Sequence, residues 1–303
     1  MQRSHIIFWR IFMKIIFKTL ITAVSLSFLS SVLYANDTKN IEIMEIGDNK
    51  IHTFYGISNS HIIETPSKLI LIDMQFNFKL ATKLNEYIKT LKKPLSKIIL
   101  SHSHPDHWFG YPIFKDVPII TTSGIVADLN HKGAFYIKRL QKKMAAIIPK
   151  KPVEPLTTLK LGKQNWGGLD VIVEEYTEQE AHHSILIKIP QHKVMIGQDL
   201  FYNNMHLVAS QRSRNNNWIK ILQSFQKNEA KLYDKILTGH GKNTDTSVFA
   251  DNITYLQKLE QILASGANKE ETKEQLIKAF PDRGGKGFIN ITVGNLFVDK
   301  NKK

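Results

Sequence analysis

The run from Ser101 to His107 places three histidines and one aspartate directly after the apolar segment Ile98–Leu100. An apolar, β-branched segment of this kind is typical of a buried strand. Imidazole and carboxylate groups are the ligands that zinc prefers, and a strand end holds them rigidly. The run therefore predicts a metal site rather than a tag or a solvated histidine cluster. Such a site needs further ligands from distant segments, so this run also constrains the fold.

The spacing within the run predicts more than one ion. His102 and His104 lie two residues apart on an extended segment, so their side chains can converge on one cation. Asp106 and His107 follow the turn at Pro105 and point elsewhere, which indicates a second cation nearby.

Three later segments offer the missing ligands. Glu180, followed by Ala181 and two histidines, precedes an apolar strand, while Asp199 and His240 each follow one. Taken alone, Asp199 is more simply a turn carboxylate and His240 a loop histidine. Beside the run at 102–107, both are better explained as ligands.

Strand-like and helical patterns alternate twice along the chain. Strands are expected at 41–46, 51–57, 60–64, 69–73, 97–100, 117–121, 171–175, 184–189, 194–196 and 235–238. Helices are expected at 77–91, with Asn77 as the cap, at 123–148, at 218–227 and over much of the chain up to about residue 280. No long linker and no repeat interrupts this order. The pattern predicts one α/β sandwich with the helices outside.

Residues 1–35 have the composition of a secretory signal peptide. They contain four basic residues and no acidic one, and an apolar stretch from Leu20 to Leu33 precedes Ala35 and polar sequence. Lys14 and Lys18 argue against a membrane span, and translation from Met13 gives a simpler leader. We expect export to the periplasm or outside the cell, with residues 36–303 as one domain that ends in a helical part.

The charge and the cysteine content limit which substrates and metal ligands are possible. Cleavage after Ala35 leaves 303 − 35 = 268 residues with a net charge of 14 − 4 = +10. No dense Lys/Arg block is interleaved with aromatic residues, so we expect a small-molecule substrate and no nucleic acid, and no stable membrane span after leader cleavage. The chain has no cysteine, so no metal ligand is a thiolate.

The chain resembles the metallo-β-lactamase superfamily. The run 102–107 matches the signature His-x-His-x-Asp-His, and Leu71–Asp73, Pro190, Asp199 and Gly239–Gly241 recur in the family order. The resemblance covers about residues 41–245. It implies an αββα sandwich, with two mixed sheets flanked by helices, and a site for two divalent ions. Zinc is the first choice for these ions, with Mn or Fe as alternatives.

The resemblance also implies which residues bind each ion. His102, His104 and a ligand near residue 180 would hold one ion, Asp106, His107 and His240 the other, and Asp199 would bridge them. Most members have a histidine ten residues before Pro190, where this chain has Glu180. Glutamate there resembles the alkylsulfatase-like branch. His182 or His183 remains an alternative ligand. Gln198 also departs from the usual glycine before the bridging aspartate.

The activity implied is hydrolysis by a metal-bridged hydroxide, with an ester, thioester, lactone or sulfate ester as substrate. Asp106 would orient the nucleophile and accept its proton, and Asp73 would bond a ligand histidine. Asp199 stands where true metallo-β-lactamases carry Cys or Ser, which disfavours cleavage of cyclic amides. A non-catalytic metal-binding or accessory protein of the periplasm is the alternative from another class.

The substrate-facing residues are less defined by sequence. His206, close after Asp199, is a candidate catalytic or substrate-contacting residue, with helix capping as the ordinary interpretation. Arg212 and Arg214 could bind an anionic group or be solvated. Trp108–Tyr111 forms either an apolar wall or core, and 283–288 is expected to be a flexible basic loop over the pocket.

Overall fold

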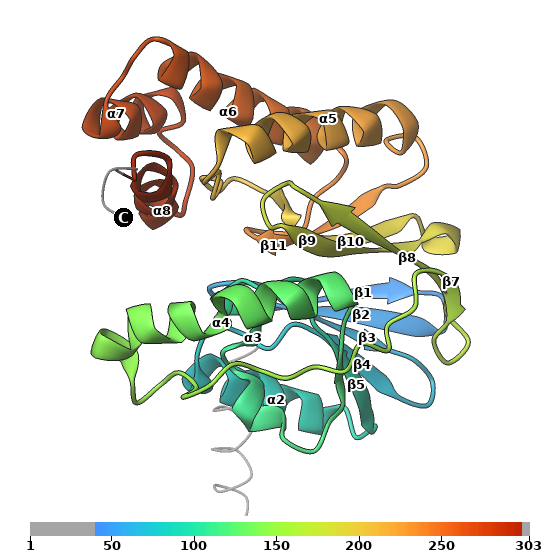
Figure 1. The fold of residues 1–303 in the computed structure, drawn as a ribbon. Coiled ribbons are helices and arrows are strands. Elements are labelled where there is room, and N and C mark those ends of the chain that lie inside the picture. The colour runs from blue at the N-terminus through green and yellow to red at the C-terminus, as the bar shows by residue number, and fades with distance from the viewer. Residues whose placement is uncertain (1–39, 299–303) are drawn as a thin grey trace, which may run out of the picture. The chain divides into compact units, whose positions relative to one another are not determined.

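The computed structural model describes residues 40–298, which form two mixed β-sheets with helices on their outer faces (Figure 1). The predicted leader, residues 1–35, lies outside the described residues. Among the helices of residues 40–298, none combines the length and the apolar character that crossing a bilayer requires.

The first sheet contains six strands in chain order. They are β1 (Ile41–Ile46), β2 (Asn49–Phe54), β3 (Ser60–Glu64), β4 (Leu69–Ile72), β5 (Leu95–Ile99) and β6 (Ile119–Ile120). β2, β3 and β4 pair antiparallel, while β5 pairs parallel with both β4 and β6. The loop after β4 and the loop after β5 therefore leave the sheet at the same edge.

The second sheet has five strands in the order β11-β10-β9-β8-β7. They are β7 (Gly162–Asn165), β8 (Asp170–Thr177), β9 (His183–Ile189), β10 (Val194–Tyr202) and β11 (Lys235–His240). Only β10 and β11 pair in parallel. The short exposed strand β7 is missed by the sequence patterns, because Gly162 to Asn165 carries no apolar alternation.

Helices cover the outer faces of the two sheets (Figure 1). The helices of residues 40–298 are α2 (Phe78–Thr90), α3 (Pro105–Trp108), α4 (Ser123–Met144), α5 (Arg212–Asn228), α6 (Ser247–Ala264), α7 (Lys269–Ala279) and α8 (Lys286–Leu296), with the 3-10 helices η2 (Tyr111–Phe114) and η3 (Pro190–His192). Helix α2 begins where the sequence predicts it, because the Asn77 side chain accepts a hydrogen bond from the Leu80 amide. Its buried residues Ala81, Leu84 and Ile88 face the first sheet.

Strand β10 is longer than predicted. The sequence pattern ends at Ile196, whereas every residue of β10 from Val194 to Tyr202 is buried. The pairing with β11 shifts register on both sides of Gln198, whose φ is +46°. Asp199 therefore lies inside an irregular buried strand and not in a loop after it. In the sequence, the polar residues Gln198 and Asp199 resemble the end of a strand, because the residues that contact their side chains are distant in the chain.

The basic segment at 283–288 is not the flexible loop that the sequence suggests. The Gly284 amide donates to the Asn204 carbonyl and the His206 amide donates to the Gly284 carbonyl, which fixes the segment to the chain after β10. The Arg283 guanidinium donates to the Met205 carbonyl at 2.9 Å and to Asp251 Oδ1 at 2.6 Å. These contacts join residues 32 to 80 positions apart, so no local pattern could predict them.

Candidate metal centre

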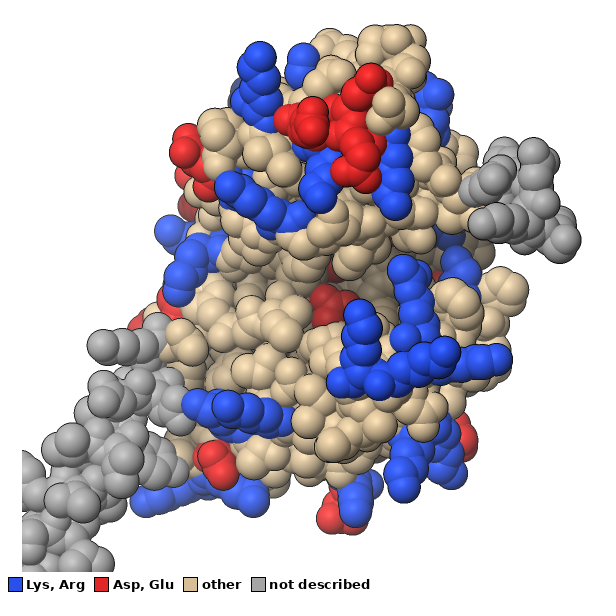
Figure 2. Space-filling model, turned by 90° about the vertical axis from the view of Figure 1, so that its left-hand side faces the viewer, with Lys and Arg blue, Asp and Glu red and all other residues tan. Residues whose placement is uncertain are grey.

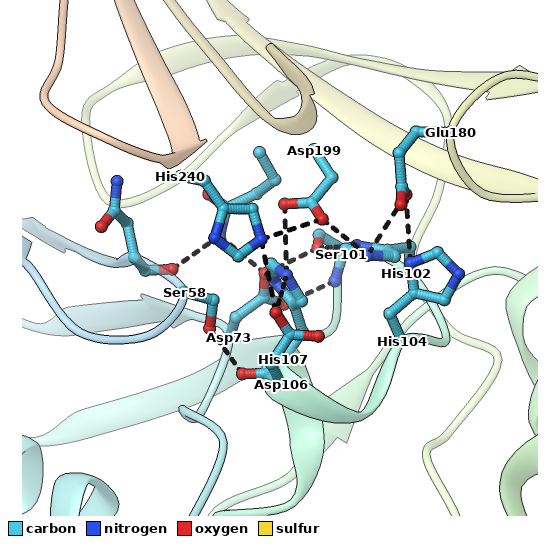
Figure 3. A network of polar contacts seen from close by, with 12 residues as sticks. Ser58, Asp73, Ser101, His102, His104, Asp106, His107, Glu180, Asp199 and His240 are labelled. Atoms are coloured by element: carbon cyan, nitrogen blue, oxygen red, sulfur yellow. Dashed lines mark hydrogen bonds and ion pairs between the residues drawn. The ribbon is translucent and has the colours of Figure 1, made fainter. Parts of the chain in front are cut away.

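The predicted ligands meet in one place, although they come from both sheets (Figure 3). His102 and His104 follow β5, and Asp106 and His107 lie on the short helix α3. Glu180 comes from the loop between β8 and β9, Asp199 from β10, and His240 is the last residue of β11. They form two groups that share Asp199: the first is His102, His104, Glu180 and Asp199, and the second is Asp106, His107, Asp199 and His240.

Ligand atoms of the first group lie at distances suited to one cation. Glu180 Oε2 is 3.1 Å from His104 Nδ1 and 3.9 Å from His102 Nε2. His102 Nε2 is also 3.6 Å from Asp199 Oδ2. Ligands bound to zinc at about 2.0–2.2 Å lie roughly 3.3 Å apart in a tetrahedral arrangement. Glu180, rather than either neighbouring histidine, therefore lies where the third ligand is expected.

The second group has similar spacing. Asp199 Oδ1 is 3.2 Å from His107 Nε2, and Asp199 Oδ2 is 3.3 Å from His240 Nε2. Asp106 Oδ2 is 3.3 Å from His240 Nε2 and 3.6 Å from His107 Nε2. The two oxygens of Asp199 thus face histidines of both groups, as expected for a carboxylate shared between two ions (Figure 3).

Several atoms of both groups are buried without a hydrogen-bond partner. They are His102 Nε2, His107 Nε2, Asp199 Oδ1 and both oxygens of Glu180. Buried polar atoms are nearly always satisfied, because an unmade hydrogen bond costs about 1–3 kcal/mol. These unpaired atoms all point to one place and carry the donor chemistry of a zinc or manganese site. The residues present therefore fit two divalent cations.

The shifted pKa values of the ligands also indicate a site for cations. Burial lowers the pKa of His240, but Asp199 and Asp106 outweigh burial and raise it to about 10. Burial raises the pKa of Asp199, but His240, His107 and His102 outweigh it and hold the pKa well below its usual value. The buried carboxylates of Glu180 and Asp199 and the partly buried carboxylate of Asp106 require positive charge, which divalent cations would supply.

Asp73 orients the ligand segment, as the sequence suggests. Its Oδ2 lies 2.6 Å from His107 Nδ1, and it accepts hydrogen bonds from the Ser101 amide and hydroxyl. The side-chain nitrogen of Gln198, Nε2, also donates to Asp73 Oδ2, at 2.6 Å. A carboxylate behind a ligand histidine fixes the orientation of its ring. Gln198 thus links the strand of Asp199 to Asp73.

Two further contacts hold ligands from the other side. His240 Nδ1 lies 2.8 Å from the Ile57 carbonyl, and the Tyr202 hydroxyl donates to Asp199 Oδ2 at 3.0 Å. The Tyr202 ring also stacks on His240, with centroids 4.9 Å apart. The sequence patterns do not mark Ser101 or Tyr202 as residues that support ligands. Their closeness to His102 and Asp199 in the chain is the signal that could have indicated them.

His182 and His183 turn away from both groups. Their Nδ1 atoms lie 2.9 and 3.0 Å from the two oxygens of Asp128 on α4. Neither histidine belongs to the ligand groups around Asp199.

His206 also lies apart from the ligands. It is fully buried, and its Nδ1 is 3.1 Å from the Tyr255 hydroxyl. Burial, followed by the charges of Arg283 and Lys286, lowers its pKa to about 4. Among the described residues, neither metal-ligand group includes His206, so its catalytic role stays a prediction.

The aromatic residues after the histidine run belong to the core. Trp108 and Phe109 are fully buried, and the Trp108 indole donates to the Ser103 carbonyl, which supports the ligand segment from below. The aromatic residue that does lie beside a ligand is Tyr136 on α4. Its ring is edge-on to His104, with centroids 6.3 Å apart.

The chain is similar to known metallo-hydrolases. A family model described as the metallo-beta-lactamase superfamily matches residues 54–240. A search of curated proteins gave no match.

Solved structures share the fold at low sequence identity. A metallo-beta-lactamase from Pontibacter korlensis is 20% identical with a TM-score of 0.52, and the match covers 72% of this chain and 99% of that one. The stereoselective inverting sec-alkylsulfatase Pisa1 from Pseudomonas sp. is 18% identical with a TM-score of 0.58. That match covers 86% of this chain and 51% of the alkylsulfatase, so this chain spans about half of that protein.

The family model covers more than half of the 303 residues and ends at His240. It includes β3–β11 and all seven residues of the two ligand groups. The chain belongs to the metallo-beta-lactamase superfamily.

Proposed function

We propose that this protein is an exported hydrolase that uses two divalent cations, with zinc as the first choice, to cleave an ester-type substrate. Asp199 carries the proposal, because its carboxylate faces both ligand groups while their buried atoms have no other partner. Cations held there supply Lewis acidity, which activates a water and polarises the bond to be cleaved.

Asp106 is the residue placed to orient the attacking water. Its side chain is 20% exposed, so it reaches the open side of the site, unlike the fully buried His107. Burial raises the pKa of Asp106, but the charges of His107 and His240 outweigh burial and hold the pKa well below its usual value. Asp106 therefore stays ionised at neutral pH, as a metal ligand must, and can accept a hydrogen bond from the water.

The surroundings favour a substrate with negative charge. Figure 2 shows a hollow with an acidic side chain inside it and Lys and Arg side chains along its lower rim. Arg214 is 12% exposed at its side chain, and its Nε forms an ion pair with the half-exposed Glu178, 3.3 Å from Oε2. Burial, followed by Glu180, raises the pKa of Tyr136 to about 12, so its hydroxyl remains a donor near His104. Arg214 and Tyr136 are therefore candidates to bind an anionic group.

Within the ester-type substrates, a sulfate ester fits these features best. The similar sec-alkylsulfatase from Pseudomonas sp. acts on such compounds according to its name. Two residues are consistent with this choice. Glu180 lies in the first group, and the carboxylate of Asp199 lies at the position that links the two ion sites.

The first experiment measures metal content of the purified mature chain beside a Glu180→Ala variant. At the site around Asp199 we expect about two metals per chain in the wild type and about one in the variant, and any ion bound elsewhere is common to both. Asp170→Ala, which removes an exposed carboxylate from the same hairpin, is the matched control and should keep both. Fewer than two metals in the wild type would contradict the di-metal site.

A substrate panel tests the reaction. Aryl and alkyl sulfates, carboxylic esters, lactones and a chromogenic cyclic β-lactam are offered to the zinc-loaded enzyme. We expect turnover of sulfate or carboxylic esters and little of the β-lactam. Turnover of the β-lactam alone would overturn the ester assignment, and turnover of none would favour a binding protein.

A further inference from the structure

A second cluster of potential metal ligands lies beside the loop that carries Glu180. Asp128 on α4 faces His182 and His183 at the start of β9, and we call these three residues the His-His-Asp cluster. His182 Nδ1 is 2.9 Å from Asp128 Oδ1, and His183 Nδ1 is 3.0 Å from Asp128 Oδ2. The cluster shares no residue with the two groups around Asp199.

Local structure brings these side chains together. Gly124 lies against the His183 ring, and a Cβ at this position would be only 2.4 Å from His183 Cδ2, so the close approach of α4 to β9 needs a glycine. The two imidazoles are edge-to-face with centroids 4.4 Å apart. Both rings thus direct Nδ1 toward the same carboxylate.

The partners of His182 require positive charge at its ring, which either a proton or a bound metal cation supplies. Its Nε2 lies 2.5 Å from Glu178 Oε1, while its Nδ1 lies 2.9 Å from Asp128. A neutral imidazole carries one N–H and can donate to only one of these carboxylates. A histidine that donates Nε2–H to a carboxylate has Nδ1 free to bind a metal, and this arrangement is typical of metal-bound histidines.

The donor set suits a first-row divalent cation. Two imidazoles and one carboxylate form known zinc and iron sites in which water fills the remaining positions. Asp128 and His183 are 13% and 20% exposed at their side chains, and His182 is 45% exposed. The site is thus partly desolvated yet open to water. The spacing of its ligand atoms is close to that of His104 and Glu180 in the first group.

We propose that Asp128, His182 and His183 form a third metal site, separate from the catalytic pair, that binds Zn²⁺ or a similar divalent cation. Glu178 would hold the His182 ring from behind. A cation at this site would cross-link α4 to the loop that contains Glu180, since His182 lies two residues after that ligand.

The test is zinc stoichiometry of the full mature chain after equilibration with excess zinc and removal of free metal. We expect three zinc ions per chain in the wild type and two in an Asp128→Asn/His183→Gln double variant. His131→Gln, which changes an exposed histidine on the same helix, is the matched control and should keep three.

A second variant separates this proposal from the proposed function. Glu180→Ala/Asp199→Asn removes ligands of the catalytic pair but leaves the His-His-Asp cluster intact, so it should retain the zinc ion of that cluster. Circular dichroism confirms that each variant is folded. Cobalt loading gives an independent readout, because the wild-type spectrum minus that of the Asp128→Asn/His183→Gln variant should show the absorption of one bound Co²⁺. Two zinc ions in the wild type, or three in the double variant, would overturn the third site.

Discussion

At the scale of single residues, the role of each polar side chain follows from what it faces. Glu180 and His182 are two positions apart, yet Glu180 faces His104 and His182 faces Asp128. His61 offers a similar lesson away from the ligands. It is fully buried, with Nδ1 near the Thr53 hydroxyl and Nε2 near the Gln198 side-chain oxygen, both at 3.0 Å. It serves the framework behind the metal centre as a neutral imidazole.

Because of His61, we expect the free energy of unfolding to decrease as the pH falls. Burial lowers its pKa from 6.5 to about 4, so the fold favours the neutral form. The resulting stability is fully present above pH 6.5 and is lost as the pH falls toward 4. From the shift we expect a loss of about 2 kcal/mol in the free energy of unfolding between pH 7 and pH 5.

Urea unfolding followed by tryptophan fluorescence at several pH values measures this loss. A His61→Gln variant should show a shallower decrease of stability between pH 7 and pH 5, because glutamine does not titrate. His131→Gln, at an exposed position, should keep the wild-type slope. Equal slopes for wild type and His61→Gln would show that His61 is not the group responsible.

At the scale of elements, the approach of β10 to β11 positions the shared ligand. A Cβ on Gly239 would lie 1.9 Å from Asp199 Oδ1 and 2.8 Å from the Asp199 amide nitrogen. Only a glycine in β11 therefore leaves room for the Asp199 carboxylate. The shifted register around Gln198 turns Asp199 toward the histidines rather than along the strand.

Gly239→Ala should displace Asp199 without removing any ligand. We expect the free energy of unfolding to fall by about 2 kcal/mol from overpacking, together with loss of bound metal. Gly294→Ala is the matched control, because nothing lies within 4 Å of a Cβ at this position of α8. That variant should keep its metal and gain up to about 1 kcal/mol from helix propensity. Full metal content in Gly239→Ala would show that β10 can adjust.

At the scale of the whole molecule, the metal centre joins the two sheets. The first sheet and the segments after it supply His102, His104, Asp106 and His107, and the second supplies Asp199 and His240. Asn59 adds a direct link, because its side chain donates to the carbonyls of Thr238 and Gly241. Metal binding should therefore stabilise the domain as a unit.

Removal of metal tests this link. Binding at a metal concentration of 1,000 times Kd stabilises a protein by about 4 kcal/mol. For a domain of this size, that corresponds to a fall of roughly 10 °C in Tm after chelation. Thermal unfolding before chelation, after chelation and after zinc is restored measures the effect. An unchanged Tm would indicate that the two sheets pack equally well without metal.

The histidine run 102–107, the helix start at Asn77 and the alternation of strands and helices follow from the sequence, because each depends on residues close together in the chain. The placement of Glu180 in the first group, with its neighbouring histidines facing Asp128 on α4, is visible only in the tertiary structure. It also decided the length of β10 and the fixed position of Arg283. Contacts between segments far apart in the chain set these features, and local sequence patterns do not encode them.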